Sequence, residues 1–194
     1  AETYTLPNNY QSVENITALE RGMSSNYTQA AVLSEALASL YKEGDLRLDA
    51  YFKAADKNGY RFSQKSGKDD FRCSFRVGEM YLNSAEAAAQ SDKLPQARTR
   101  LLELMQKRYT PEAYTVKATA VNAMTKEALI QEILDERARE LAFEGHRWFD
   151  LRRTTRPRIE KVLKGGTYVL EQDDSRYTIQ IPREAIAANP ELSN

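Results

Sequence analysis

The chain has a single cysteine, Cys73, so no disulfide can form within it and no cysteine-based metal cluster is possible. Its one histidine, His146, has no second histidine with which to share a metal. Glycine and proline are scarce, at 8 and 6 residues, which excludes collagenous and most disordered compositions. We therefore expect a folded chain without a metal or a cofactor, in which Cys73 is a partly buried structural thiol.

Net charge is also absent, because 28 basic side chains balance 28 acidic ones. The lysines and arginines are interleaved with aspartates and glutamates, so no basic face is available for phosphate contacts, and we exclude nucleic acid as a partner. The sequence contains no run of about 18 apolar residues that could span a membrane. Its first residues lack the basic and apolar regions of a signal peptide, so we expect either a cytoplasmic chain or one whose export signal has been removed.

Apolar residues recur at helical spacing through much of the chain, which favours a mainly α-helical fold. The best helix start is at Thr125, an N-cap residue followed by Glu127 in the first turn, where the helix dipole favours an acidic side chain. We expect helices over 29–41, over 75–91, over 94–108, and from Thr125 at least to Phe143.

The second and third of these helices follow the size pattern of a tetratricopeptide unit, with small residues that let two antiparallel helices approach closely. A solenoid normally needs three or more such units, so we expect this one to dock on other helices. We interpret its patterned positions as core rather than as a ligand groove. They are Tyr81, Ala85, Ala88, Ala97, Leu101 and Leu104.

The remaining segments are expected to be irregular or extended. Residues 1–27 are interpreted as irregular with a short helix around 12–21, and 109–123 as a loop. Asn58-Gly59 predicts a β-hairpin with a type I′ turn, and the β-branched runs 167–170 and 176–181 predict a second hairpin. The tyrosines of the irregular segments are either solvated or ligand contacts. They are Tyr4, Tyr10, Tyr27, Tyr109 and Tyr114.

The stretch 136–153 is the densest feature of the sequence. It places three glutamates at i, i+4 and i+8, where like charges on a helix repel one another, so the stripe needs cationic partners. Guanidinium groups suit that task if the stripe is buried. The glutamates are Glu136, Glu140 and Glu144, and the arginines available locally are Arg137, Arg139 and Arg147.

Two interpretations of this stretch remain open. The first is a structural ion-pair network, with Trp148 and Phe149 in the core. The second is acid/base catalysis by Glu140, Glu144 and His146, as in a hydrolase. The sequence has no His-Glu-x-x-His motif and no detectable Ser-His-Asp arrangement, which favours the structural interpretation.

Two motifs, over residues 76–86 and 136–153, resemble those of the SusD/RagB family of nutrient-capturing outer-membrane lipoproteins. Lesser features in the same order, from Asp45-Leu46-Arg47 to Asn189-Pro190, extend the resemblance over about residues 30–194. We expect 30–194 to be a SusD-like C-terminal domain, and 1–29 to be an irregular polar and aromatic segment of the same domain.

The resemblance implies a fold in which a tetratricopeptide-like helix pair and a long helix pack together, with one or two short β-hairpins. It also implies a non-catalytic cell-surface lipoprotein that binds an oligosaccharide and delivers it to a TonB-dependent transporter barrel. Family members are typically more than twice this length, so the chain resembles the C-terminal portion, and the missing N-terminal half would be a partner. The alternatives are a peptide-capturing member of the family and a generic helical-repeat interaction module.

The resemblance implies that the motif residues are scaffold, and no ligand-binding residue is carried over by motif match. Composition alone suggests Tyr4, Tyr10 and Tyr27 as ligand contacts. The scaffold residues are Arg76, Glu79, Tyr81, Glu86, Glu136, Arg137, Glu140, Glu144, Arg147, Asp150 and Arg153.

Overall fold

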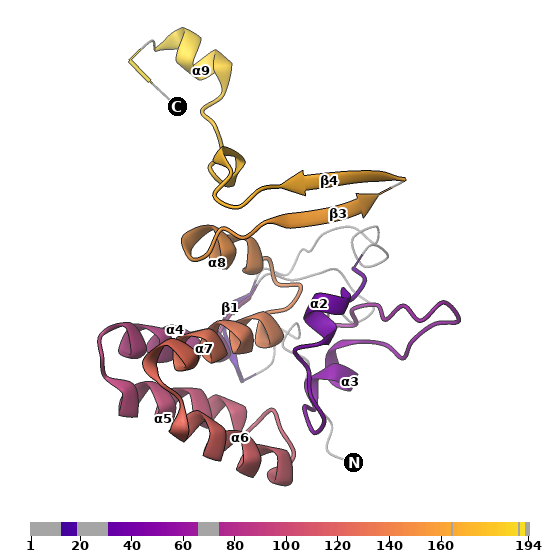
Figure 1. Cartoon of the computed structure of the whole chain (residues 1–194), viewed down its shortest axis with the longest axis vertical. Helices are drawn as coiled ribbons and strands as arrows, with labels where there is room; N and C mark the ends of the chain where they lie inside the picture. Colours follow the sequence, from indigo (N-terminus) through magenta and orange to yellow (C-terminus); the bar gives the residue numbers. More distant parts are fainter. Residues whose placement is uncertain (1–12, 19–30, 66–73, 164, 190, 193–194) are drawn as a thin grey trace. The chain divides into compact units, whose positions relative to one another are not determined.

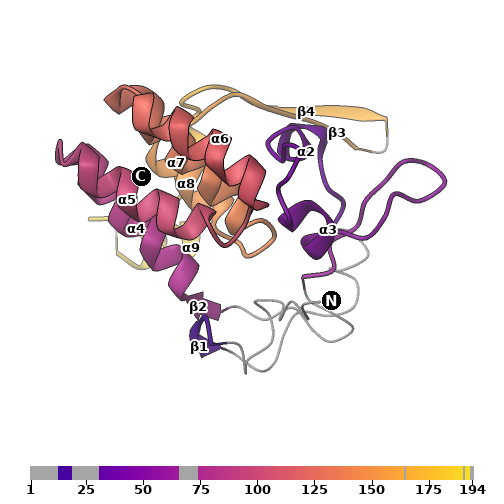
Figure 2. The same cartoon turned by 90° about the horizontal axis from the view of Figure 1, so that it is seen from below.

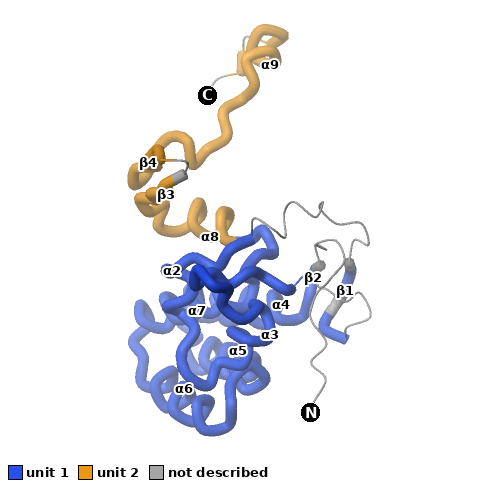
Figure 3. The backbone as a smooth tube through the Cα atoms, turned by 90° about the vertical axis from the view of Figure 1, so that its right-hand side faces the viewer, with its two compact units in different colours: residues 1–146 blue, residues 147–194 orange. Residues whose placement is uncertain are grey.

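The structure is a computed structural model that describes residues 13–18, 31–65, 74–163, 165–189 and 191–192 (Figure 1). It is mainly helical with two small antiparallel strand pairs, which confirms the predicted fold class. Figure 3 shows that the chain divides after His146 into two compact units.

The centre of the first unit is a group of long helices, in which α4 packs against α5 and α7, and α5 packs against α6 (Figure 1, Figure 2). Two short helices and one strand pair precede or flank this group. The elements are β1 (Asn15–Ala18), α2 (Glu35–Ala38), α3 (Arg47–Tyr51), β2 (Ser74–Arg76), α4 (Val77–Gln90), α5 (Leu94–Met105), α6 (Pro111–Ala123) and α7 (Lys126–Glu140).

The helix pair predicted from residue sizes is present as α4 and α5. Ala85 and Ala97 are fully buried, and small side chains at these positions allow the two helix backbones to approach closely. Leu101 is fully buried in the same core, and Tyr81 packs against its edge. The interpretation of these positions as core is confirmed.

Helix α7 begins where the sequence predicts, because the Thr125 side chain accepts a hydrogen bond of 3.3 Å from the Ala128 amide. The predicted end at or beyond Phe143 is wrong. The helix stops at Glu140, and Phe143 has a φ of +62°, a left-handed conformation that cannot continue an α-helix.

The predicted loop over 109–123 is wrong for most of its length, since Pro111–Ala123 forms α6. Thr110 caps the helix by accepting from the Ala113 amide, and Pro111 takes the first helical position, where its missing N–H costs nothing. Glu112 adds an acidic side chain in the first turn. These three consecutive residues were the signal that the sequence offered for this helix.

Two N-terminal predictions also fail. The helix expected around 12–21 is replaced, in the part that the structure describes, by strand β1. The helix expected over 29–41 is reduced to α2, because Val32 forms an antiparallel bridge with Phe62 and the Leu33 amide donates to the Arg61 carbonyl at 2.8 Å. Pairing with a distant segment thus keeps the first part of that stretch extended.

The chain reversal around Asn58-Gly59 is present, with an antiparallel bridge between Phe52 and Ser63. Gly59 has a φ of +82°, but Asn58 is not in the positive-φ region, so the turn is not of type I′. The Asp56 carboxylate accepts hydrogen bonds from the amides of Asn58 and Tyr60, at 2.8 Å each, and holds the reversal.

The second unit contains a β-hairpin whose partner strand differs from the prediction. Strand β4 pairs with β3, in the register Ile159↔Leu170, and not with 176–181. Gly165, with a φ of +79°, supplies the tight connection between the two strands. The elements are α8 (Arg147–Arg153), β3 (Ile159–Leu163), β4 (Gly166–Leu170), a 3-10 helix η1 (Ser175–Tyr177) and α9 (Arg183–Ala188).

The expectation that Trp148 and Phe149 lie in the core is wrong. Their exposed fractions are 37% and 63%. Trp148 instead stacks on Tyr177 of η1, with ring centroids 5.1 Å apart and an interplanar angle of 10°. Helix α8 ends before Pro157, as expected. The Pro157 carbonyl accepts a hydrogen bond from the Tyr177 hydroxyl.

Candidate functional site

The first unit contains a network of buried ion pairs around the C-terminal half of α7, which we call the charge cluster. It joins the end of α7 to Arg47 of α3 and Arg76 of β2. It also includes Asp45 before α3, Lys65 after α3 and Arg108 after α5. Its carboxylates are Asp45, Glu136, Glu140 and Glu144, and its cations are Arg47, Lys65, Arg76, Arg108 and Arg139.

Glu140 is at the centre of the charge cluster and is completely buried. Its carboxylate accepts from Arg76 Nη1 at 2.6 Å, from Arg108 Nε at 3.0 Å and from Arg47 Nη1 at 3.0 Å. Arg76 and Arg47 are themselves almost fully buried. Each charge is therefore compensated by partners that water does not reach, which is the condition under which buried ions are tolerated.

Glu136, one turn earlier on α7, is equally buried and lies between two guanidinium groups. Arg47 Nη1 is 2.8 Å from its Oε1, and Arg139 Nη2 is 2.7 Å from its Oε2. Arg47 is also held by Asp45, at 2.8 Å, and donates to the Tyr109 hydroxyl at 3.1 Å. The guanidinium of Arg47 thus connects α7 to the residues that precede α3 and α6.

Lys65 and Arg76 close the C-terminal end of α7. The Lys65 ammonium donates to the carbonyls of Glu140 and Ala142, at 2.7 and 3.0 Å, and to the Glu144 carboxylate at 2.5 Å. Arg76 donates to the same Glu140 carbonyl at 2.6 Å and to Glu144 at 2.8 Å. These cations satisfy carbonyls that a helix leaves without partners at its end.

The pairing controls the protonation of all three glutamates. Burial acts to raise the pKa of Glu140, but attraction by Arg108, Arg76 and Arg47 outweighs it and holds that pKa well below its usual range. The pKa values of Glu136 and Glu144 are lowered for the same reason. Burial lowers the pKa of Lys65 to about 8, an effect opposed by Glu144. The glutamates are therefore ionised near neutral pH.

Acid should destabilise the fold through these carboxylates. Because Glu136, Glu140 and Glu144 have lower pKa values in the folded chain than the ordinary 4.5, the unfolded chain binds more protons below that pH. The contribution of these carboxylates to folding stability is complete above pH 4.5. It is lost as the pH falls through their lowered pKa values in the folded chain. We expect the midpoint of urea unfolding, followed by far-UV circular dichroism, to fall steadily below that pH.

The matched comparison for this prediction is Glu140→Gln against Glu103→Gln. Glutamine at 140 removes one carboxyl group whose pKa is lowered by folding, so the unfolding midpoint should fall less steeply as the pH is lowered. Glu103 is an exposed carboxylate on α5, and its replacement should leave the dependence unchanged. If the unfolding midpoints of the two variants fell equally steeply with pH, the charge cluster would not govern stability in acid.

The cationic partners of the stripe are mostly not those that the sequence offered locally. Arg139 pairs with Glu136 as expected, but Arg137 donates to Asn83 at 2.6 Å, and Arg147 is exposed at the start of α8. Lys65 and Arg108 are separated from Glu140 by 75 and 32 residues, so no local pattern could connect them.

The other motif residues make individual contacts. Glu79 lies 3.8 Å from Nδ1 of His146, and Glu86 is buried 4.0 Å from Nε of Arg137. Arg153 pairs with Asp150 at 2.7 Å within α8. That the motif residues form scaffold and do not contact a ligand remains a prediction. Tyr4, Tyr10, Tyr27 and Cys73 lie outside the described residues.

The acid/base interpretation finds no support in this geometry. Glu140 and Glu144 each contact several cations and have lowered pKa values, so neither is suited to donate a proton at neutral pH. His146 contacts Glu79, and not the carboxylates of the stripe.

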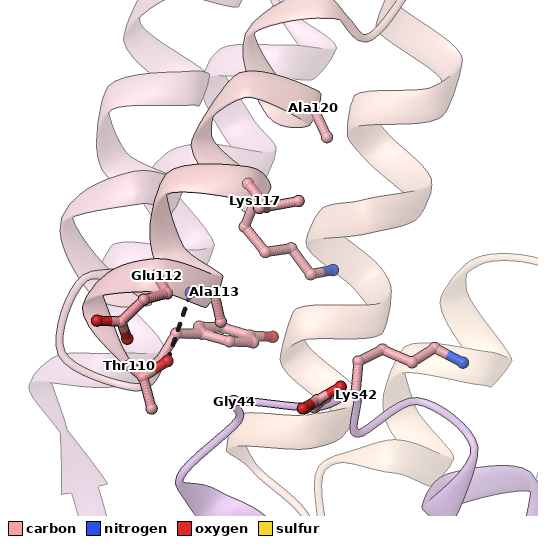
Figure 4. A pocket seen from close by; sticks show the side chains of 10 residues that line it. Lys42, Gly44, Thr110, Glu112, Ala113, Lys117 and Ala120 are labelled. Atoms are coloured by element: carbon pink, nitrogen blue, oxygen red, sulfur yellow. Dashed lines mark hydrogen bonds between the residues drawn. The ribbon is translucent and has the colours of Figure 1, made fainter.

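Next to the charge cluster, a groove of about 790 Å³ lies between α6 and the turn that precedes α3 (Figure 4). Figure 4 shows Ala113, Lys117 and Ala120 on α6, with Gly44 and Lys42 on the segment opposite. We call this feature the α6 groove. Its lining consists of Lys42, Glu43, Gly44, Tyr109, Thr110, Glu112, Ala113, Val116, Lys117 and Ala120.

Close backbone contacts fix one end of the α6 groove. The Thr110 amide donates to the Gly44 carbonyl at 2.9 Å. Gly44 has a φ of +80°, and a Cβ built on it would lie 2.4 Å from the Cβ of Ala113, so only glycine fits there. The groove is therefore formed by segments that are held together without a ligand.

Among the residues that the structure describes, no group of three or more histidine, cysteine, aspartate or glutamate side chains could hold a metal ion. Over the same residues, no helix has the length and apolar character needed to cross a membrane.

Comparison with protein families gives a match between residues 8–194 and the model of the SusD family. Two of the solved structures that share the fold are from Bacteroides species. One is a SusD-like carbohydrate binding protein from Bacteroides vulgatus ATCC 8482, with a TM-score of 0.55, 20% identity, and coverage of 83% of this chain. The other is a SusD superfamily protein from Bacteroides fragilis, with a TM-score of 0.59, 20% identity and 83% coverage.

The chain spans less than half the length of either solved structure, 41% of the first and 36% of the second. No curated protein matches it. At 20% identity the two structures establish the fold alone, while the family match extends over nearly the whole chain.

Proposed function

Since this chain belongs to the SusD family, we propose that it is part of a non-catalytic protein that binds an oligosaccharide at the bacterial cell surface. In this proposal the protein is an outer-membrane lipoprotein that delivers its ligand to a TonB-dependent transporter barrel. Its other partner is the N-terminal half of the same, longer protein.

The observation that carries the proposal is the family match over residues 8–194. The Bacteroides vulgatus protein of the same fold is described as carbohydrate binding, which favours a glycan as the ligand. The lowered pKa values of Glu140 and Glu144 support binding without catalysis, because the most conspicuous carboxylates of the sequence are held in ion pairs.

For the ligand contacts we propose Tyr4, Tyr10 and Tyr27. Sugars present C–H faces that pack on aromatic rings, and the N-terminal 29 residues are rich in tyrosine and in amide side chains that can bond hydroxyl groups. This assignment rests on composition.

Native electrophoresis through gels containing a panel of polysaccharides tests the proposal. We expect at least one polysaccharide to retard the chain, or a version of it extended upstream, relative to a reference protein that binds no sugar. Replacing Tyr4, Tyr10 and Tyr27 with alanine should abolish the retardation, since stacking on aromatic rings contributes much of the affinity. The matched control replaces Tyr60 and Tyr168, which are 55% and 63% exposed.

The outcomes separate the alternatives. Unchanged retardation of the triple variant would show that the tyrosine assignment is wrong, although glycan binding would stand. If no polysaccharide retards either version and immobilised peptides retain them, the protein is a peptide-capturing member of the family. Degradation of the polysaccharide during long incubation would contradict the non-catalytic assignment.

A further inference from the structure

The α6 groove has an apolar wall with helical spacing. Ala113, Val116 and Ala120 stand at i, i+3 and i+7 on α6, so they follow one side of the helix. Val116 is 71% exposed, although it is a large aliphatic residue in the middle of the wall. Small residues on either side of it leave room for a second backbone to approach.

An adjoining side of α6 packs against the core. Val121 is fully buried in the core, Tyr114 packs against it, and α6 packs against α5. Figure 2 shows α6 beside α5 at the margin of the helix group. The helix is thus anchored by one face, and Val116 and Ala120 of the groove wall lie exposed beside that face.

Two carboxylates on the rim of the groove are available to a ligand. Glu43 and Glu112 are exposed, and neither makes an ion pair with any residue that the structure describes. The cation within the groove, Lys117, is 3.1 Å from Glu132 and is therefore already compensated. Lys42 supplies one rim cation against these two rim carboxylates. A basic partner complements this rim.

The lining favours a polypeptide over a sugar. Tyr109 is the aromatic residue of the lining, but only 4% of its surface is exposed and its hydroxyl is bonded to Arg47, so it offers no face for stacking. Aliphatic side chains at i, i+3 and i+7 instead match the spacing at which an amphipathic helix presents its own apolar residues.

We propose that the α6 groove is the docking site for a basic amphipathic helix supplied by another polypeptide. The apolar face of that helix packs against Val116 between Ala113 and Ala120, and lysine or arginine side chains on its flank pair with Glu43 and Glu112. Because the groove is preformed by the contact of Gly44 with α6, docking requires no rearrangement of the chain. The assignment goes beyond glycan binding and does not depend on it.

Fluorescence anisotropy with a synthetic labelled helix of about five turns tests the proposal. The probe has leucine at i, i+3, i+4 and i+7 and lysine on both flanks, and a second probe carries glutamate in place of lysine. We expect the 194-residue chain to bind the lysine probe saturably and the glutamate probe at least about tenfold more weakly.

Variants of the chain locate the binding. Val116→Asp should weaken binding of the lysine probe by about tenfold or more, because it places a charge in the apolar wall. Val162→Asp is the matched control, since Val162 is 68% exposed on β3, and it should bind as the native chain does. Replacing Glu43 and Glu112 with glutamine should weaken binding, whereas Glu127→Gln, an exposed carboxylate on α7, should not.

The proposal is overturned if the lysine probe does not bind, or if Val116→Asp binds it as tightly as the native chain. Equal binding of the two probes would refute a basic partner. Circular dichroism of each variant establishes that it is folded. Retardation in polysaccharide gels is measured separately, so failure of this proposal and failure of glycan binding are distinguishable.

Discussion

Replacing Glu140 with alanine should lower the free energy of unfolding by about 3–5 kcal/mol, the largest effect expected of any single substitution in the charge cluster. The carboxylate contacts Arg47, Arg76 and Arg108, all within 3.0 Å. Without it, guanidinium groups that are almost completely buried lose a counter-charge that water cannot replace. Urea unfolding followed by far-UV circular dichroism measures the change.

Glu103→Ala is the control for this measurement. Glu103 also forms an ion pair, with Arg100 at 2.8 Å, but the two side chains are 42% and 43% exposed. Water and salt screen such a pair, so the cost should not exceed about 1 kcal/mol. If Glu140→Ala is too unstable to purify, Glu140→Gln keeps the shape of the side chain and should still be clearly destabilised. If the substitution at position 140 lowered the free energy of unfolding no more than the one at position 103, the charge cluster would not stabilise the fold as proposed.

Leu101→Ala should destabilise the chain by about 2–5 kcal/mol. Leu101 is completely buried on α5, among residues of the core that also holds Ala85, Ala97 and Leu129. Truncation removes apolar contacts and leaves a cavity that packed helices fill only in part. The same unfolding measurement applies, and the midpoint should fall without a change in the slope of the transition.

Val116→Ala provides the comparison for the core substitution. Val116 is 71% exposed, so its truncation should change the free energy of unfolding by no more than about 0.5 kcal/mol. This variant also separates stability from docking, because it shortens the apolar wall of the α6 groove without adding a charge. If Leu101→Ala cost as little as Val116→Ala, the α4–α5 pair would not be part of the core.

Elements with local signals were predicted well. Thr125 caps α7 through the amide of Ala128, three residues away, and such a contact is encoded within a few positions of sequence. The pairing of α4 with α5 followed from small residues and a short connection. Helix α6 carried equally local signals, Thr110 and Pro111, but it was missed because Tyr109, Pro111 and Tyr114 were interpreted as residues of a loop.

Elements that depend on distant partners were predicted poorly. The stretch before α2 has helical spacing of apolar residues, yet Val32 is held extended by Phe62. Strand β4 had two possible partners of suitable composition, and it pairs with the one that Gly165 brings directly against it. At Val32 the backbone pairing outweighed the periodicity of the side chains, and at β4 the tight connection through Gly165 decided between segments of similar composition.

By itself the sequence determined that Glu136 and Glu140 share one face of a helix, that closely spaced glutamates require cations, and that two motifs resemble those of the SusD family. The tertiary structure alone decided which cations they are. Helix hydrogen bonds join residues four positions apart, so their signals are local, whereas Arg47 and Arg76 reach Glu140 across 93 and 64 positions of sequence. The α6 groove was also decided by the tertiary structure, because its two sides come from segments that only the folded chain brings together.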